Sequence, residues 1–256
     1  MATTLLKKSY RISNFKEIPF RDLWGKHGVF TTMRIIGKPI KIIFFKEHIQ
    51  NLIKSMKDYR IYKKELKLII KKILNITLKK NIKYNHLLRL AITKDIISVS
   101  LRVRINPSKN FTINLYNYKR ERPDYKNLKY NKILKKMNFI NVKNCDLGLT
   151  QKGKILETAT ANILFVKNNI LYSPKDHFYK GITIKYLNKM VNIKYTHIPL
   201  KNLHDYDEII LVGSGKGIVS LSKVEGHSWR RRSTKNYKIL KNLYNKAVTK
   251  CPLYYS

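Results

Sequence analysis

The chain has 256 residues, 43% of them hydrophobic, and a formal net charge of +39. This length is large for one domain and sufficient for two small ones with a substantial core. No apolar run approaches the roughly 18 residues that a membrane-spanning helix needs, so we expect no membrane partner. Lys7 and Lys8 are not followed by an apolar segment, so we expect no signal peptide. Cys145 and Cys251 lack metal-type spacing and are typical of a reducing, cytoplasmic compartment.

The basic composition by itself is typical of proteins that bind nucleic acids. The lysines, however, are spread along the whole chain rather than gathered in one tail. We therefore expect no specific nucleic-acid partner. The densest clusters, Lys63 to Lys80 and Arg230 to Arg232, leave a basic nucleic-acid-binding protein as an alternative.

Residues 27 to 105 show the alternation and spacing of a mixed α and β domain. Two β-rich runs flank Gly37-Lys38-Pro39 and predict a hairpin. A helix is expected from about Lys46, and a second, lysine-faced helix at about residues 66–74. Strands are expected at residues 87–92 and 96–105. This order of elements predicts a compact α+β domain.

The second half of the chain begins with a strand at residues 111–118 and a charged stretch at residues 119–124. We predict that this stretch is the crossover between a small N-terminal α/β domain, residues 1–118, and a larger C-terminal domain, residues 119–256. The later elements expected are a loop that leads into a helix within residues 125–137, helices at residues 181–190 and 233–248, and strands at residues 193–198 and 207–212.

The most informative stretch is Gly153 to Pro174. An apolar run ends at Glu157, four small residues follow, and Asn162 opens a new strand that turns back at Asn168-Asn169. A carboxylate beside small residues is what a pyridine-ring cofactor requires, because the acid keeps the ring nitrogen protonated. The stretch resembles the Glu-x-x-x-x-Asn signature of the class IV aminotransferases. The alternative is an ordinary hairpin with one solvated glutamate.

Two further motifs of that family are similar to segments of the N-terminal half. Gly28 to Arg34 is similar to a Gly-x-Phe-Glu/Thr-Thr-x-Arg strand, and Glu47 to Leu52 to a His-x-x-Arg-Leu helix. In the family, the arginine of this helix binds the cofactor phosphate. Asn51 stands in its place here, which removes a charge-assisted contact and leaves an inactive member of the family as an alternative.

Three motifs of the C-terminal half follow in the order of the family. Residues 125–131 resemble its cofactor-lysine box, in which Lys126 fits the spacing best and Lys129 is the alternative. Gly181-Ile182-Thr183 resembles a box that opens a helix. Gly213 to Gly217 follows a predicted strand, and such a turn exposes backbone N–H groups that can hold a phosphate.

The resemblance covers about residues 27 to 226 and implies a two-domain fold-type-IV enzyme that uses pyridoxal 5′-phosphate. It implies Lys126 as the covalent anchor of the cofactor and Glu157 as the partner of its ring nitrogen. The cofactor-binding residues implied are Lys126, Glu157, Ile182, Thr183, Ser214, Gly215, Lys216 and the substituted position Asn51. The substrate-binding candidates are Phe30, Thr32, Arg34 and Arg89.

The resemblance also implies a small-molecule amino substrate and a homodimer. Phe-Thr-Thr-x-Arg and Ala161-Asn162 favour an aminodeoxychorismate lyase of folate biosynthesis, which releases pyruvate and 4-aminobenzoate. The Gly-Ser-Gly-Lys-Gly turn favours instead an amino-acid aminotransferase of the branched-chain or D-amino-acid type. We favour the lyase and keep the aminotransferase as the alternative.

Overall fold

The computed structural model describes residues 4–254. Its contacts divide the chain into two compact units. The first unit comprises the residues up to 104, residues 125–130 and the residues from 250 onward. The second unit comprises residues 105–124 and 131–249.

The first unit is a six-stranded antiparallel sheet with two helices. The sheet has the strand order β2-β1-β6-β5-β3-β4. Its elements are β1 (Thr4–Arg11), β2 (Glu17–Ile18), β3 (Val29–Gly37), β4 (Lys41–Ile42), α1 (Phe45–Asp58), α2 (Leu66–Thr77), β5 (Tyr84–Ile92) and β6 (Ile96–Val103). The hairpin, the two helices and the strand pair predicted from the sequence are confirmed.

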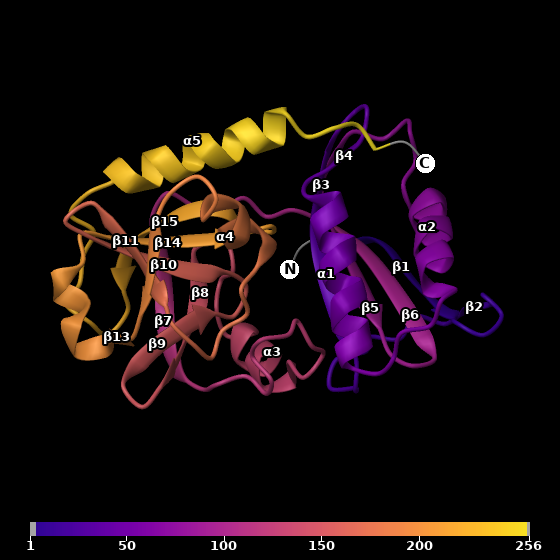
Figure 1. Cartoon of the computed structure of the whole chain (residues 1–256), viewed down its shortest axis with the longest axis horizontal. Coiled ribbons are helices and arrows are strands. Elements are labelled where there is room, and N and C mark those ends of the chain that lie inside the picture. The colour runs from indigo at the N-terminus through magenta and orange to yellow at the C-terminus, as the bar shows by residue number, and fades with distance from the viewer. Residues whose placement is uncertain (1–3, 255–256) are drawn as a thin grey trace. The chain divides into compact units, whose positions relative to one another are not determined.

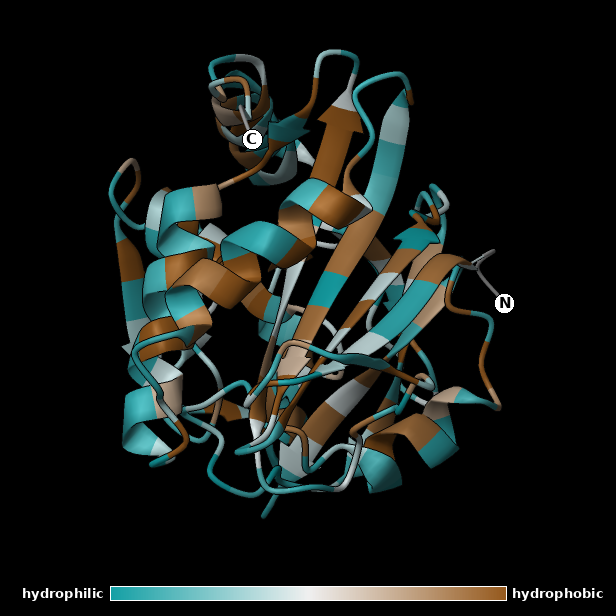
Figure 2. Ribbon diagram, turned by 90° about the vertical axis from the view of Figure 1, so that its right-hand side faces the viewer, coloured by the Kyte–Doolittle hydropathy of each residue, from teal (hydrophilic) through white to brown (hydrophobic). Residues whose placement is uncertain are grey.

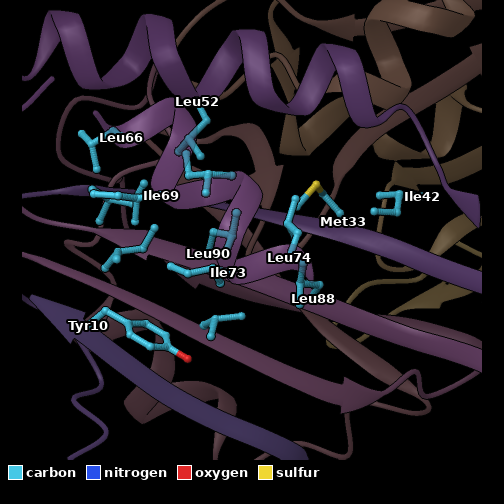
Figure 3. Close-up of a cluster of buried hydrophobic side chains, with 14 of the residues drawn as sticks. Tyr10, Met33, Ile42, Leu52, Leu66, Ile69, Ile73, Leu74, Leu88 and Leu90 are labelled. Atoms are coloured by element: carbon cyan, nitrogen blue, oxygen red, sulfur yellow. The ribbon is translucent and has the colours of Figure 1, made fainter. Parts of the chain in front are cut away.

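The core of the first unit lies between the sheet and the two helices. Alternate residues of β3, such as Met33 and Ile35, point to this side and are fully buried, as are Leu88 and Leu90 of β5. Figure 3 shows Met33, Leu88 and Leu90 in one cluster with Leu52 of α1 and with the α2 residues Leu66, Ile69, Ile73 and Leu74. Along the helices and strands in Figure 2, hydrophobic and hydrophilic residues are interspersed, as expected for elements that bury only one face.

Strand β1 was not predicted, because apolar and polar residues do not alternate regularly along its sequence. It places two lysines among apolar residues, yet it pairs with β6 over seven residues. Tyr10 and Ile12 are 3% and 4% exposed and complete the core. Long-range pairing, which no local pattern reports, determines this strand.

The second unit is a nine-stranded mixed sheet with three α-helices. Its strand order is β12-β11-β10-β14-β15-β7-β8-β9-β13, and Figure 1 labels the helices α3, α4 and α5 around it. Its elements are β7 (Phe111–Asn117), α3 (Asn131–Met137), β8 (Cys145–Gln151), β9 (Lys154–Thr158), β10 (Asn162–Lys167), β11 (Ile170–Pro174), α4 (Ile182–Leu187), β12 (Ile193–Thr196), β13 (Ile198–Pro199), the 3-10 helix η1 (Leu200–Asp205), β14 (Glu208–Gly213), β15 (Gly217–Val224) and α5 (Lys235–Thr249).

The hairpin between β10 and β11 has the predicted two-residue turn. Asn168 and Asn169 both have left-handed backbones, with φ of 52° and 59°. Asparagine tolerates this region better than most residues. The turn sets the register in which Phe165 pairs with Tyr172.

The predicted domain boundary after residue 118 differs from the division of the structure. Strand β7 belongs to the second unit, because it pairs in parallel with both β8 and β15. Residues 125–130 belong to the first unit, although the sequence assigns them to the second domain. Among residues 4–254, no helix is long and apolar enough to cross a membrane.

Candidate active site

Lys126 lies in the extended segment 125–130, which pairs with the start of β3. The amide of Phe30 donates to the carbonyl of Lys126 at 2.9 Å. The Lys126 side chain is half-buried, and its Nζ lies 5.2 Å from the centre of the Phe30 ring. The side chain of Lys129, the alternative cofactor lysine, is exposed. Of these two lysines, Lys126 is the one in a partly desolvated position.

Gly28 allows this segment to lie directly against the sheet. The amide of Leu128 donates to the carbonyl of Gly28 at 3.0 Å. A Cβ at Gly28 would lie 2.3 Å from the carbonyl oxygen of Ile92 and 2.7 Å from Cδ1 of Leu128. Because the nearer of these atoms belongs to the backbone, a side chain does not fit. The absence of a side chain at Gly28 therefore allows β3, the end of β5 at Ile92 and the segment at Leu128 to pack closely together.

Aromatic side chains surround the Phe30 ring. Trp24 meets it edge-on with ring centres 4.8 Å apart, and Tyr130 does so at 5.6 Å. Leu23, Ala91 and Leu128 complete the cluster. The predicted substrate residue Phe30, 7% exposed, thus forms an apolar wall beside the amine of Lys126.

His48 joins α1 to the other face of β3. Its Nδ1 lies 2.8 Å from Oγ1 of Thr31, and the imidazole is 5% exposed. Burial lowers the pKa of His48 to about 3, and the charge of Lys126 contributes to this. The imidazole is therefore neutral at physiological pH. It serves as a packing and hydrogen-bonding group rather than a cation.

Asn51 lies three residues after His48 on α1 and is half-buried. Its carbonyl accepts a hydrogen bond from Oγ of Ser55 at 2.9 Å. A neutral amide cannot supply the bidentate, charge-assisted phosphate contact of an arginine. Lys54, the nearest cation along the helix, is exposed.

Three arginines share the face of the first sheet that points away from its helices. Thr32 of β3 pairs with Arg89 of β5. Leu87 of β5 pairs with Arg34 of β3 on one side and with Arg102 of β6 on the other. Because side chains alternate along a strand, all five lie on the same face as Phe30. We call Arg34, Arg89 and Arg102 the arginine face.

The arginine face carries little compensating negative charge. Arg89 donates to Oδ1 of Asp22 at 2.9 Å and stacks 4.5 Å over the ring of Trp24. Nε of Arg34 is buried without a hydrogen-bond partner among the described residues. Desolvation of the guanidinium, followed by the charge of Arg89, lowers the pKa of Arg102, although the residue as a whole is exposed. Buried donors and crowded like charges of this kind favour an anionic ligand.

Glu157 lies on β9 in the second unit, where its carboxylate is held by two donors. Nε of Arg120 donates to Oε1 at 2.7 Å, and the amide of Tyr179 donates to Oε2 at 3.3 Å. Glu157 is 4% and Arg120 2% exposed. A second guanidinium nitrogen of Arg120 donates to the carbonyl of Pro123 at 2.9 Å. The geometry fixes the carboxylate in one orientation.

Asn162, the second residue of the Glu-x-x-x-x-Asn signature, fixes the corner that precedes α4. Its Nδ2 donates to the carbonyl of Tyr179, and its Oδ1 accepts from the amide of Gly181 at 3.0 Å. A Cβ at Gly181 would lie 2.8 Å from this Oδ1. The glycine and the asparagine therefore fit each other, and together they position the first turn of α4.

Two of the predicted phosphate-binding residues lie together. Oγ1 of Thr183, in the first turn of α4, lies 3.5 Å from Oγ of Ser214. Ser214 and Gly215 belong to the turn of the β14–β15 hairpin, whose ends pair at Gly213 and Gly217. Ile182 precedes Thr183 and is buried. The structure thus joins the helix-opening box and the glycine-rich turn.

The ammonium group of Lys216 contacts a buried acid and an aromatic ring of the second unit. Its Nζ lies 3.8 Å from Oδ2 of Asp146 and 4.4 Å from the centre of the Phe111 ring. Asp146 is fully buried and also accepts from the hydroxyls of Thr158 at 2.8 Å and Thr160 at 2.6 Å. Lys216 therefore helps to neutralise the acid that orders the small-residue corner after Glu157. Its backbone N–H is the group suited to a phosphate.

Sequence reasoning missed Arg120 and Asp146 as functional residues. Arg120 precedes Glu157 by 37 positions, and no spacing rule connects the two. The sequence offers one indication: Arg120 and Asp146 lie near motifs that contain charged residues, and a charged residue that becomes buried needs a partner of opposite charge. Lys126 and Glu157 belong to different units, and their predicted convergence on one cofactor stays a prediction.

Solved structures with the same fold come from several organisms. A branched-chain aminotransferase from Thermoproteus uzoniensis, determined with norvaline, shares 14% identity over 97% of this chain and 96% of its own, with a TM-score of 0.77. A hypothetical aminotransferase from Mycobacterium tuberculosis, in its PLP-bound form, shares 14% identity over 95% and 99%, with a TM-score of 0.73.

A candidate 4-amino-4-deoxychorismate lyase from Legionella pneumophila is also similar. It shares 20% identity over 86% of this chain and 91% of its own, with a TM-score of 0.68. At these identities the likeness shows the fold alone. No curated protein matches the sequence significantly.

The sequence itself matches the amino-transferase class IV family over residues 28–224, which is most of the chain. This confirms the resemblance found in its motifs, the fold-type-IV α+β class, and an enzyme of the transaminase or lyase type that uses pyridoxal 5′-phosphate. The chain belongs to the class IV aminotransferases.

Proposed function

We propose that the protein is a lyase of this family that converts aminodeoxychorismate to 4-aminobenzoate and pyruvate. The observation that carries the proposal is the arginine face of the first sheet. Aminodeoxychorismate bears two carboxylates, whereas a branched-chain amino acid bears one carboxylate and an apolar side chain. A face with three guanidiniums is better matched to the substrate with two carboxylates.

The chemistry of the arginine face supports a bound carboxylate. Arginine presents planar N–H pairs that match the two oxygens of a carboxylate. Arg34 has a buried Nε without a partner in residues 4–254, and Arg102 is held near the like charge of Arg89. Asp22 compensates Arg89. Phe30, which lies in the same face, is next to the amine of Lys126.

The residues of the second unit fit pyridoxal phosphate. The neighbouring hydroxyls of Thr183 and Ser214, with the backbone of Ile182 and Gly215, match a phosphate. The buried carboxylate of Glu157 suits a protonated ring nitrogen. When bound, the cofactor supplies an electron sink for the bonds at the amine-bearing carbon of the substrate.

The roles of the protein residues follow from their positions. Lys126 holds the cofactor and later moves a proton at the substrate carbon as general acid and base. Arg120 orients Glu157 through Nε, while the amide of Tyr179 fixes its other oxygen. Phe30 shields the amine from water. The arginine face binds the substrate carboxylates, and Thr32 lies beside Arg89 within it.

An amino-acid aminotransferase is the second candidate. The turn Gly213-Ser214-Gly215-Lys216-Gly217 favours it, and the arginine face would also accept 2-oxoglutarate, a dicarboxylate. Both candidates share the cofactor and Lys126. They differ in the bond that is broken and in the need for a second substrate.

Two assays separate the candidates. We expect the purified protein, supplied with pyridoxal phosphate and aminodeoxychorismate but with no added 2-oxo acid, to release 4-aminobenzoate and pyruvate. Glutamate formed from leucine or D-alanine plus 2-oxoglutarate, without 4-aminobenzoate release, would establish the aminotransferase instead. A protein that never becomes yellow with the cofactor would leave an inactive or nucleic-acid-binding protein.

The lysine assignment has its own spectroscopic test. We expect Lys126→Ala to lose the yellow, borohydride-reducible cofactor and Lys129→Ala to retain it. The opposite pattern would assign the covalent anchor to Lys129.

A further inference from the structure

The second unit contains a pocket of about 240 Å³ that none of the proposed roles uses. The residues that line it are Lys119, Gln151, Lys152, Lys154, Leu156, Asp176, His177 and His197. They come from the segment after β7, the β8–β9 hairpin, the segment after β11 and the segment between β12 and β13. All of them lie within one compact unit.

The lining of this pocket is cationic. Lys119, Lys152 and Lys154 contribute three positive charges, and Asp176 contributes one negative charge, which leaves +2 with neutral histidines. The Asp176 carboxylate lies 3.9 Å from Nδ1 of His197. Lys119 and Lys154 are half-buried, so their charges are less screened than those of solvated surface lysines.

The pocket adjoins the Glu157–Arg120 pair along both chain segments. Leu156 immediately precedes Glu157 and is 4% exposed, and Lys119 immediately precedes Arg120. The register of β9 against β8 shifts here, since Leu149 pairs with Glu157 and Thr150 with Ile155. Leu156 is therefore the extra residue of a bulge, a device that redirects side chains near functional sites.

One wall of the pocket continues directly into the contacts of Glu157. Asp176 and His177 line the pocket, and two residues later the amide of Tyr179 donates to Oε2 of Glu157 at 3.3 Å. The carbonyl of Tyr179 accepts from Asn162. His177 has a left-handed backbone with φ of 58°, a conformation that needs support from its surroundings.

We propose that this pocket binds a small anion with two or more negative charges, carboxylate or phosphoryl in chemistry, and that the bound anion orders the segment Asp176 to Gly181. The ammonium groups of Lys119 and Lys154 supply charge-assisted hydrogen bonds, and the amide of Gln151 and the imidazole groups supply further donors. The site goes beyond the proposed reaction and does not depend on it.

The test is a titration of cofactor-saturated protein with inorganic phosphate and, separately, with citrate, followed by calorimetry. Absorbance establishes cofactor loading first, so that failure of the proposed function is seen independently. We expect saturable binding that includes one equivalent in this pocket, which the pocket variants weaken; the arginine face accounts for any further equivalent of citrate. Stronger binding of citrate would identify a carboxylate site, and stronger binding of phosphate a phosphoryl site.

A matched pair of variants separates the pocket from the general basic charge. Lys119→Gln with Lys154→Gln should weaken anion binding at least tenfold. Lys67→Gln with Lys71→Gln removes the same charge from exposed positions of α2. This pair should change the Kd for the anion less than twofold. Equal weakening in both pairs, or no saturable binding in the unchanged protein, would overturn the proposal.

Hydrogen–deuterium exchange supplies a readout that is independent of binding heat. Saturating anion should slow exchange of the amides in residues 175–181 in the unchanged protein and in the α2 variant. His197→Gln, an exposed position, serves as a second pocket variant should the lysine pair fold poorly. Exchange in this segment that is unaffected by anion in the unchanged protein would contradict the ordering role.

Discussion

Nε of Arg120 donates to Oε1 of Glu157 at 2.7 Å, and the two side chains are 1% and 6% exposed. Breaking a buried ion pair leaves the other charge without a partner, which costs about 3–5 kcal/mol. Arg120→Met should therefore destabilise the protein by roughly this amount in urea unfolding. The double variant Arg120→Met with Glu157→Gln should be clearly more stable than the sum of its single changes. Additive losses would show that the pair is not coupled.

His48 makes stability depend on pH. Its folded pKa is about 3, below an unfolded value of about 6.5. The unfolded state therefore binds a proton that the folded state excludes, and stability falls as the pH drops below 6.5 toward 3. Between pH 7 and pH 5 this linkage costs about 2 kcal/mol.

The variant His48→Gln isolates this contribution. Other titrating groups are common to both proteins, so the difference between their unfolding free energies at pH 7 and pH 5 reports His48. The unchanged protein should lose about 2 kcal/mol more than the variant. Parallel pH curves would show that His48 is accessible to protons in the folded state.

Glu208 caps the N-terminus of α5 from β14. Its fully buried carboxylate accepts from the amides of Asn236 at 2.8 Å and Tyr237 at 2.9 Å. Glu208→Ala leaves these amides unsatisfied and should destabilise the protein by roughly 2–4 kcal/mol. Glu208→Gln keeps an acceptor and should lose less. Thermal unfolding followed by circular dichroism measures both, and equal losses would exclude the carboxylate as the effective cap.

Thr183 and Ser214 should determine cofactor affinity. The loss of one phosphate hydrogen bond is worth about tenfold in Kd, so Thr183→Val and Ser214→Ala should each weaken pyridoxal phosphate binding by about that factor. Thr196→Val, a half-buried position on β12, is the matched control. Absorbance titration of the protein with cofactor gives the affinities. An unchanged Kd in both site variants would show that Thr183 and Ser214 do not bind the cofactor phosphate.

Arg102 should affect the substrate without affecting the cofactor. A charge-assisted hydrogen bond contributes about 1.5–3 kcal/mol, so Arg102→Gln should raise KM for aminodeoxychorismate by about 10- to 100-fold. Cofactor absorbance should stay the same. Arg21→Gln removes an equal charge from an exposed position of the same unit and should leave KM within twofold. A KM that responds to neither change would remove Arg102 from the substrate site.

Much of the fold could be predicted from local patterns. The periodic apolar residues of α1 and α2, the turn residues Asn168-Asn169 and the alternation in β3 all report nearest-neighbour preferences of the chain. The motifs around Gly28, Glu157 and Gly213 identified the family for the same reason, because their spacing is contained in short segments.

The partners of the buried charges could not be predicted in this way. Arg120 and Glu157 are 37 residues apart, and Lys216 reaches Asp146 across 70 positions. Any of 54 lysines and arginines could have compensated these acids. Burial decides among them, because a charge inside the protein requires a partner within hydrogen-bond distance.

The sequence by itself therefore determined most of the order of the elements and the family, and it supplied the candidate residues for the chemistry. Tertiary structure decided which side chain faces which: that Arg120 holds Glu157, that His48 is neutral beside Thr31, and that three arginines share one face of the first sheet. Local preferences act between neighbours along the chain, whereas these pairings arise from long-range packing and from the need of buried polar groups for partners.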